Sequence, residues 1–376
     1  MNDKIFIVSF YDYYKLNENR ISSPAAINKI DYVAKVLSSH YQVNIISPSW
    51  TNNKKIYTGK RINIDNNIYL KLFTTFPWIS LLKIPSFIIA YIQFFIFLLF
   101  NVRKNENVIV YHSLYLVNVI KLLKKIKRFN LILEVEEIYS DLIDSKRIKK
   151  KEYKFFEISD KFIFITNLLQ EKINKDKKPY AIVHGKYFVE EKICKKFNDN
   201  KIHVVYSGVI DTQKKGAYTS CDISNYLSEK YVIHIIGFGK DIDIEILKER
   251  INQYNKKNPC KILYDGLKKG NDYIGYLQKC DVGLSTQNPN AAYNDTSFPS
   301  KILSYMSCGL RVVTVDIPAI KTSDVSDYLY YYKNDDPREI AEIIKSIDFS
   351  EKYDSKKILN DLNNNFTQKI MEVLNE

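Results

Sequence analysis

The run of residues 294–313 places a lysine where a helix disfavours one. Pro299 suits the first turn of a short helix, and Gly309 suits its left-handed end. Lys301 falls in that first turn, where a cation opposes the helix dipole unless an anion is also present. Free backbone N–H groups at the same end also favour an anion, usually phosphate. We therefore predict a phosphate-bearing ligand near residues 296–301. The residues expected to bind this ligand are Thr296, Ser297, Ser300, Lys301 and Ser304.

A second glycine-containing segment belongs to the same half of the chain. Gly237 and Gly239 flank Phe238 at the end of a predicted strand. Glycines there permit a tight turn from strand to helix and a close approach of ligand to backbone, although a plain turn is an equal interpretation. The third glycine of a dinucleotide fingerprint would fall at Ile242, which disfavours a nicotinamide or flavin site.

Carboxylates cluster in the first half of the chain, where a predicted strand ends. Glu134, Glu136 and Glu137 repel one another, and such a cluster at the carboxyl edge of a parallel sheet is a candidate site. Glu136 or Glu137 would orient a substrate hydroxyl or act as a general base. The alternative is that these carboxylates only favour a helix dipole. His112, after another strand, is a candidate for substrate contact or a core histidine.

Short apolar runs alternate with helical patterns, which predicts parallel sheets in βα units. The expected strands lie near 5–9, 43–47, 107–111, 130–134, 161–166, 180–183, 203–207, 232–236, 261–264, 281–285, 311–315 and 328–332. Two such sets predict an α/β fold with two doubly wound domains. We expect the first domain at 1–190, the second at 200–354 and a C-terminal helix at 355–376.

Composition limits the partners. The chain has 376 residues, 45% of them hydrophobic, and a formal net charge of +13. We find no nucleic-acid-binding motif, and aromatic residues are not interleaved with the basic runs, so no nucleic acid is expected. The charge instead favours an anionic membrane surface. Histidines and acidic residues do not cluster as metal ligands do, so we predict a metal-independent reaction without a cofactor.

One segment has a membrane-like composition. Residues 79–100 contain Lys83, Pro85 and Gln93, which leaves an apolar-dominated stretch of about 17 residues at 84–100, at the low edge of a spanning length. A buried helix, a helix partly exposed to the bilayer and a transmembrane helix are the three interpretations. Nearby, Lys121, Lys125 and Arg128 share a helical face opposite an apolar face that includes Leu122 and Ile126. Together the two features make docking at a membrane surface credible.

Residues 298–309 carry a family resemblance. Phe298-Pro299-Ser300-Lys301, Tyr305-Met306 and Gly309 resemble the donor-site segment of GT-B fold glycosyltransferases, most of all family 4. The resemblance implies two facing Rossmann-like domains with a deep interdomain cleft. It makes 1–190 the acceptor-binding domain and 200–354 the donor-binding domain, with the helix at 355–376 packed back on the N-terminal domain. It also likens Gly208 and the Lys-Gly pair Lys215-Gly216 to the family's opening strand and phosphate-contacting lysine. Many relatives carry two glutamates where this chain has Thr296 and Ser304, which leaves the stereochemistry of transfer open.

The resemblance implies a function at a membrane. The expected activity is transfer of a sugar from a nucleotide-diphosphate donor to a bacterial surface glycan or lipid-linked glycan, with the enzyme peripheral at the cytoplasmic face. His112 would then contact the reacting sugar. Two rivals remain: a sugar-nucleotide epimerase, which needs more carboxylates and histidines near the donor, and a non-catalytic nucleotide- or glycan-binding partner.

Overall fold

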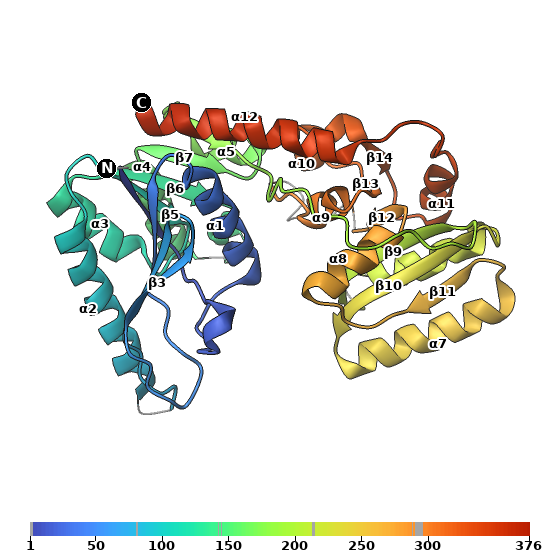
Figure 1. The fold of residues 1–376 in the computed structure, drawn as a ribbon, viewed down its shortest axis with the longest axis horizontal. Helices are drawn as coiled ribbons and strands as arrows, with labels where there is room; N and C mark the ends of the chain where they lie inside the picture. The colour runs from blue at the N-terminus through green and yellow to red at the C-terminus, as the bar shows by residue number, and fades with distance from the viewer. Residues whose placement is uncertain are drawn as a thin grey trace. The chain divides into compact units, whose positions relative to one another are not determined.

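The chain forms two compact α/β units. The computed structural model describes residues 3–79, 82–141, 143, 145–212, 215–287, 289 and 296–376. The first unit consists of Met1–Lys186 together with Asn365–Glu376, and the second is Tyr187–Asn364. Each unit is built around one mostly parallel sheet with helices packed against it (Figure 1). The predicted fold class, two doubly wound α/β units, is confirmed.

The first unit has an eight-stranded sheet. Its order is β3-β4-β2-β1-β5-β6-β7-β8, and all pairs are parallel except β3 with β4. The strands are β1 (Lys4–Val8), β2 (Gln42–Ser47), β3 (Lys60–Asp65), β4 (Ile68–Leu72), β5 (Asn107–Tyr111), β6 (Asn130–Val135), β7 (Lys161–Phe164) and β8 (Tyr180–Ile182). The chain order reverses between β1 and β5, the kind of position at which such sheets bind ligands.

Helices cover both faces of this sheet. Figure 1 shows α1 on one face and α2 with α3 on the other. The helices are α1 (Pro24–Leu37), α2 (Lys83–Asn101), α3 (Val117–Lys127), α4 (Lys146–Ile158), α5 (Asn167–Ile173) and the C-terminal part of α12 (Ser355–Asn375). The α12 part is held by a stack of Phe366 on Tyr32, with ring centroids 5.7 Å apart, and by bonds from Asn107 and Lys161 to the Leu374 carbonyl.

The second unit has a six-stranded, fully parallel sheet. Its order is β11-β10-β9-β12-β13-β14, the order of a dinucleotide-binding fold, with the reversal between β9 and β12. The strands are β9 (Ile202–Ile210), β10 (Tyr231–Gly239), β11 (Lys261–Tyr264), β12 (Val282–Ser285), β13 (Arg311–Val315) and β14 (Leu329–Tyr332). The helices are α6 (Gly216–Asp222), α7 (Asp241–Lys257), α8 (Gly270–Lys279), α9 (Lys301–Ser307), α10 (Pro318–Lys321), α11 (Pro337–Lys345) and the start of α12.

Every predicted strand is present, and one hairpin was missed. The β3–β4 pair is antiparallel and lies at the edge of the first sheet. Its first strand alternates between half-buried and exposed side chains and contains Lys60, Arg61 and Asp65, so it lacks the apolar run that marks a buried parallel strand. Strands β9 and β10 continue to Ile210 and Gly239, beyond the predicted strand ends at 207 and 236.

Candidate functional site

A pocket lies where the chain order of the second sheet reverses. Its volume is about 410 Å³, and it opens beside the carboxyl ends of β9 and β12. The residues that line it are Tyr206, Gly208, Val209, Gly216, Thr286, Gln287, Ser297, Phe298, Pro299, Ser300 and Lys301. Four predicted donor-site residues therefore share one pocket: Gly208, Ser297, Ser300 and Lys301. Parallel sheets bind ligands at this edge because the loops that follow neighbouring strands diverge there.

Helix α9 positions the lysine. Lys301 is its first residue, and Tyr305, one turn later, is fully buried. The Tyr305 hydroxyl accepts a hydrogen bond from the Ser207 N–H at 2.8 Å and donates one to the Leu284 carbonyl at 3.2 Å. These bonds fasten α9 to both β9 and β12. A Cβ on Gly283 would lie 2.3 Å from the Tyr305 ring, so this position requires glycine.

The lysine ammonium lies over an aromatic ring. Lys301 Nζ is 4.4 Å from the centroid of the Tyr206 ring, a cation–π distance. Gly208 and Gly216 leave room for this arrangement, because a Cβ would lie 3.3 Å from Lys301 Nζ at the first position and 2.8 Å from the Tyr206 ring at the second. The Tyr206 hydroxyl donates to the Val209 carbonyl at 3.1 Å, which fixes the ring. The ammonium is therefore held at the pocket wall.

The start of α9 differs slightly from the prediction. The helix begins at Lys301 with Ser300 as its N-cap, so Pro299 lies just before the first turn, and the Ile302 N–H donates to the Pro299 carbonyl at 3.0 Å. The left-handed exit is confirmed, with φ of +88° at Gly309. Thr296 is half-buried outside the pocket lining, and the Ser304 hydroxyl donates to the Ser300 carbonyl at 3.4 Å. Residues 294 and 295 lie outside the described part of the chain.

The other predicted donor residues do not line this pocket. Gly237 and Gly239 belong to the last three residues of β10, and α7 begins at Asp241, so the predicted tight turn from strand to helix is confirmed. They allow close strand packing, because a Cβ at Gly237 would lie 1.8 Å from the Gly208 carbonyl oxygen and one at Gly239 2.3 Å from that of Ile210. Lys215 is exposed, and its backbone is left-handed. Burial raises the pKa of Asp335, and the charge of Lys215 partly offsets this increase. Lys214 lies outside the described residues.

A second cluster lies in the first unit, at the end of β6. Lys29 from α1 is buried, and its Nζ is 2.9 Å from a carboxylate oxygen of Glu136 and 4.0 Å from one of Glu134. The same ammonium donates to the Val183 carbonyl at 2.7 Å. The predicted repulsion between these carboxylates is therefore offset by a cation from a distant helix. A charged side chain this deeply buried needs such partners.

Burial changes the acidity of the cluster. Desolvation raises the pKa of Glu134 to about 8, with the Lys29 charge acting in the opposite direction. Both carboxyl oxygens of Glu134 are buried without a hydrogen-bond partner among the described residues, and the buried oxygen of Glu136 is the one that faces Lys29 Nζ. Glu137 is exposed at its outer edge, and partial burial with the charge of Glu136 raises its pKa as well. The cluster can thus accept hydrogen bonds from a polyhydroxy ligand.

His112 is placed as a core histidine. Its side chain is buried, with its ring centroid 5.0 Å from that of Tyr139 and 5.3 Å from that of Phe156. Burial lowers the pKa of His112 to about 4, so the ring is neutral near pH 7. Its Nε2 lies 3.4 Å from a carboxylate oxygen of Glu152, which itself caps the backbone of Tyr139 and Ser140. A hydrogen bond with the backbone of Glu137 opposes this lowering of the His112 pKa, so the ring lies beside the segment that carries Glu136 and Glu137.

Sequence reasoning missed Lys29 and Tyr206. Lys29 stands beside Ala26, Ile30 and Val33 on the apolar face of α1, and a lysine on such a face is a signal that it has a buried partner. Tyr206 gave no comparable signal, because in the sequence it is one of several apolar residues of the β9 strand.

Metal ligands do not gather in the described part of the chain. No group of three or more His, Cys, Asp or Glu side chains there could hold a metal ion. Asp241 and Asp243 lie in the first turn of α7, where carboxylates favour the helix dipole.

Comparison with solved structures decides the fold. An Anabaena protein, Alr3699/HepE, in complex with UDP and glucose, matches with a TM-score of 0.63 and 13% identity over 99% of both chains. An α,α-trehalose 6-phosphate synthase from Burkholderia multivorans matches with a TM-score of 0.65 and 9% identity over 100% of this chain and 96% of its own. The chain has the GT-B fold.

A third matching structure contains a UDP-sugar, and the Anabaena structure contains UDP with glucose. The third is an E. coli structure described as trehalose-6-phosphate bound with UDP-2-fluoro glucose, with a TM-score of 0.66 and 11% identity over 99% of both chains. No protein-family model matches the chain, and no curated protein matches its sequence. The likeness is therefore one of GT-B architecture at low sequence identity.

Proposed function

We propose that this protein is a glycosyltransferase that moves a sugar from a nucleoside-diphosphate donor to a growing bacterial surface glycan, without a metal ion. The pocket at the ends of β9 and β12 carries this proposal. It combines a lysine held at the wall, backbone glycines that permit close approach, and the hydroxyls of Ser297 and Ser300. A positioned cation stabilises a departing diphosphate as negative charge develops on it.

The GT-B fold of the matched structures supports the same reaction class. Two of the three matches have UDP or a UDP-sugar bound, so UDP is the first donor nucleotide to test. The resemblance of residues 298–309 to family 4 supports the narrower proposal of a surface-glycan acceptor. That resemblance includes Phe298, Pro299, Ser300 and Lys301, all of which line the pocket.

The carboxylate cluster of the first unit supports an acceptor-side role. In the proposed step an acceptor hydroxyl oxygen bonds to the anomeric carbon, and the bond from that carbon to the nucleoside diphosphate breaks. The hydroxyl proton passes to a carboxylate, for which we propose Glu136, because its side chain is partly exposed and Lys29 fixes one of its oxygens. Lys29 acts as a positioning residue for that carboxylate.

The donor proposal is tested by thermal unfolding with UDP, GDP, CMP and ADP, each without metal and with a chelator present. One nucleotide is expected to raise the Tm by several degrees at saturation, because it binds only the folded state. Lys301→Ala is expected to weaken that binding at least about tenfold, since it removes a charge-assisted contact with the diphosphate.

Lys321→Ala is the matched control. Lys321 lies over the ring of Tyr331 at 3.5 Å in the same unit, so this variant also loses a stacked lysine but lies outside the pocket lining. Equal loss of binding in both variants, or no Tm shift with any nucleotide, would overturn the donor site.

Binding that depends on Lys301 but produces no transfer to glycan would favour a non-catalytic nucleotide-binding partner. The hydroxyls at Thr296 and Ser304, in place of the relatives' glutamates, are the observation behind that second candidate.

A further inference from the structure

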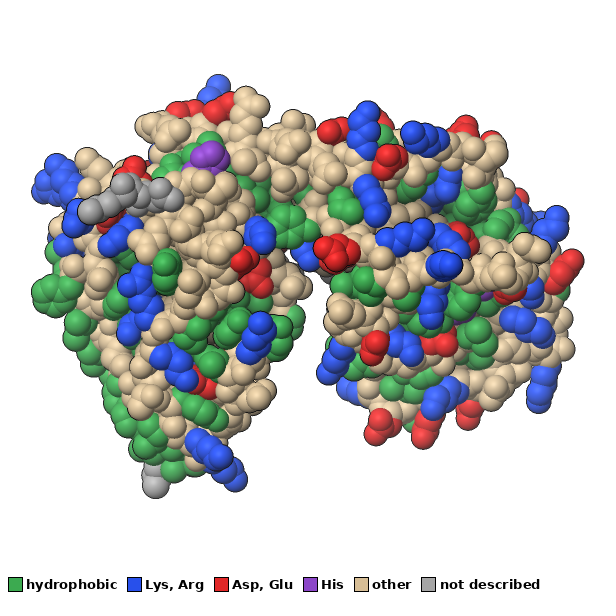
Figure 2. Space-filling view, viewed as in Figure 1, with side chains coloured by type: hydrophobic (Ala, Val, Ile, Leu, Met, Phe, Trp, Pro, Cys, Tyr) green, Lys and Arg blue, Asp and Glu red, His purple; other side chains and the backbone are tan. Residues whose placement is uncertain are grey.

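Helix α2 is apolar on the face that it turns to solvent. Its inner face, with Ala90, Phe94 and Leu98, is buried in the first unit. The outer face carries a row of side chains spaced four residues apart, with exposed fractions of 73, 49, 51, 47 and 80%, which we name the α2 ridge: Ile84, Ile88, Ile92, Ile96 and Phe100. At 1.5 Å per residue the row is about 24 Å long. Figure 2 shows hydrophobic side chains gathered along this edge of the first unit.

The inner contacts hold α2 flat against its own unit. The Gln93 side chain donates to the Thr74 carbonyl at 2.9 Å and accepts from the Thr74 N–H at 3.1 Å. The rings of Phe73 and Phe94 meet with centroids 6.4 Å apart. The segment Ile84–Asn101 is long and apolar enough to span a bilayer, but a span would break these contacts and pull β5 away from its sheet. The ridge is therefore a surface feature of a packed helix.

Helix α3, next to α2, is basic. Leu122 and Ile126, which belong to the predicted apolar face of this helix, are each 50% exposed. Ile120 and Leu123 of the same face are buried, so only part of the apolar face packs against the rest of the first unit. Three cations of α3 and its C-cap are exposed and have no acidic partner among the described residues, and we name them the α3 cations: Lys121, Lys125 and Arg128.

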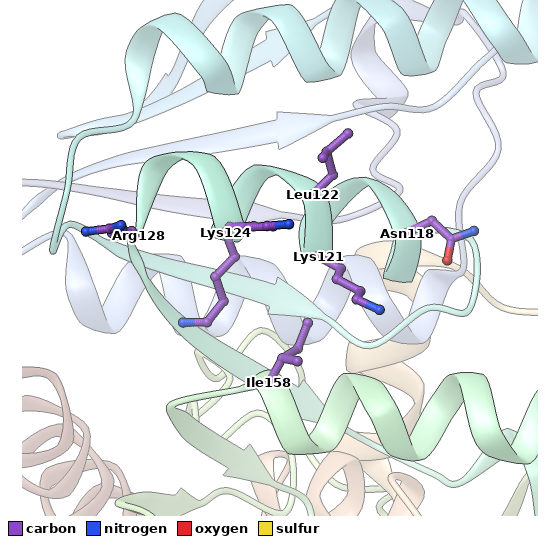
Figure 3. A pocket seen from close by; sticks show the side chains of 7 residues that line it. Asn118, Lys121, Leu122, Lys124, Arg128 and Ile158 are labelled. Atoms are coloured by element: carbon purple, nitrogen blue, oxygen red, sulfur yellow. The ribbon is translucent and has the colours of Figure 1, made fainter.

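A basic groove runs along the side of α3. It has a volume of about 660 Å³ and is lined by Asn118, Lys121, Leu122, Lys124, Lys125, Arg128 and Ile158. Figure 3 shows Lys121 and Ile158 pointing toward one another, with Leu122 on the opposite side of α3. Lys124 pairs with Asp160, which leaves the α3 cations to meet an anion from outside. Cationic heads above apolar atoms match the phosphate and the upper acyl chain of an anionic lipid.

We propose that the α2 ridge and the α3 cations seat the first unit on an anionic lipid bilayer. The ridge enters the boundary between headgroups and acyl chains, and the α3 cations bind headgroup phosphates. Charge complementarity selects this occupant: an apolar row beside unpaired cations fits a surface that is apolar in depth and negative at its face. One weak anchor seldom suffices, and here an apolar and an electrostatic anchor lie on adjacent helices.

The test is co-sedimentation of the full chain with vesicles of phosphatidylcholine alone and of phosphatidylcholine mixed with phosphatidylglycerol. Binding is expected only to the anionic vesicles and is expected to weaken with salt. The double variant Ile88→Asn, Ile92→Asn should reduce binding at least about tenfold. Lys121→Gln with Lys125→Gln should reduce it about fivefold for each lysine and flatten the salt dependence.

Matched control pairs lie on α7 of the second unit. Ile242→Asn with Ile246→Asn has the same spacing on another exposed face, and Lys256→Gln with Lys257→Gln removes the same charge. Both controls should bind vesicles as the unaltered chain does. Equal binding by ridge and control variants, or equal binding to neutral and anionic vesicles, would overturn the proposal. The proposal would also be overturned if the unaltered chain formed a dimer but did not bind vesicles, and the ridge variant lost that dimer. The ridge would then bind a second copy of the chain. The ridge variant should bind nucleotide as the unaltered chain does. Measuring this binding separates a failure of membrane docking from a failure of the donor site.

Discussion

Lys29 shows what one buried side chain does to its neighbours. Its ammonium contacts Glu136 closely and Glu134 at a longer distance, so one cation faces two carboxylates. Glu136 is partly exposed and closest to the lysine, whereas Glu134 is completely buried. Because burial raises the pKa of Glu134, this carboxyl keeps its proton near neutral pH, while Lys29 contacts Glu136.

Glu134→Gln should change the pH dependence of stability. Since burial raises the pKa of Glu134 from 4.5 to about 8, the folded state keeps a proton that the unfolded state loses. This stabilising contribution is complete below the unfolded-state pKa and is lost as the pH rises to the folded-state pKa, by at most about 1.4 kcal/mol per pH unit. The variant should lack this slope between about pH 5 and about pH 8 in denaturant unfolding.

The control for that measurement is Glu245→Gln, on an exposed position of α7. It should retain the slope of the unaltered chain. A Glu134→Gln profile parallel to that of the control would mean that Glu134 is already ionised in the folded protein near neutral pH.

Helix α9 is the element on which the donor proposal depends. Its seven residues carry both Lys301 and the anchor Tyr305, one turn apart on the same face. The Tyr305 hydroxyl joins α9 to β9 and β12, so the lysine is fixed relative to the two strands that open the pocket. A short helix without this tether has little stability of its own.

Tyr305→Phe should therefore weaken nucleotide binding without touching the pocket lining. It leaves the Ser207 N–H buried without its acceptor, a loss of about 1–3 kcal/mol in stability. Isothermal titration with the bound nucleotide should show lower affinity because α9 is no longer fixed. Tyr276→Phe is the control, since it removes hydroxyl contacts with Asp265 and His234 in the same unit but outside the pocket. Unchanged affinity in Tyr305→Phe would rule out the tether as the device that positions Lys301.

At the scale of the whole molecule, the two units share α12. The helix begins in the second unit, and Asn365–Asn375 belong to the first, where Phe366, Ile370 and Val373 are buried. The C-terminal residues thus complete the core of the N-terminal sheet. The donor pocket, in contrast, is formed entirely by residues of the second unit.

Phe366→Ala should weaken the first unit selectively. Removing a buried phenylalanine costs about 3–5 kcal/mol, and here it also removes the stack on Tyr32. Hydrogen exchange should accelerate in β1 and β5, while nucleotide binding to the second unit is retained. Leu359→Ala, at a buried α12 position in the second unit, should produce the reverse pattern. Equal acceleration in both units for either variant would show that they unfold as one body.

The sequence alone determined the elements and part of the donor site. Apolar runs of strand length, separated by amphipathic helices, encode buried parallel strands locally, so the strands of both units were predictable. The polar edge hairpin β3–β4 lacked that signal. Pro299, Lys301 and Gly309 marked α9 because helix ends depend on residues near in sequence.

Only the tertiary structure decided which side chains meet. Lys29 joins Glu134 and Glu136 across more than a hundred residues of chain, and Tyr206 meets Lys301 because β9 and β12 are neighbours. The same holds for the α2 ridge. A helix that is apolar on every side has no pattern that separates the buried Phe94 from the exposed Ile96, so packing against the rest of the unit makes that choice.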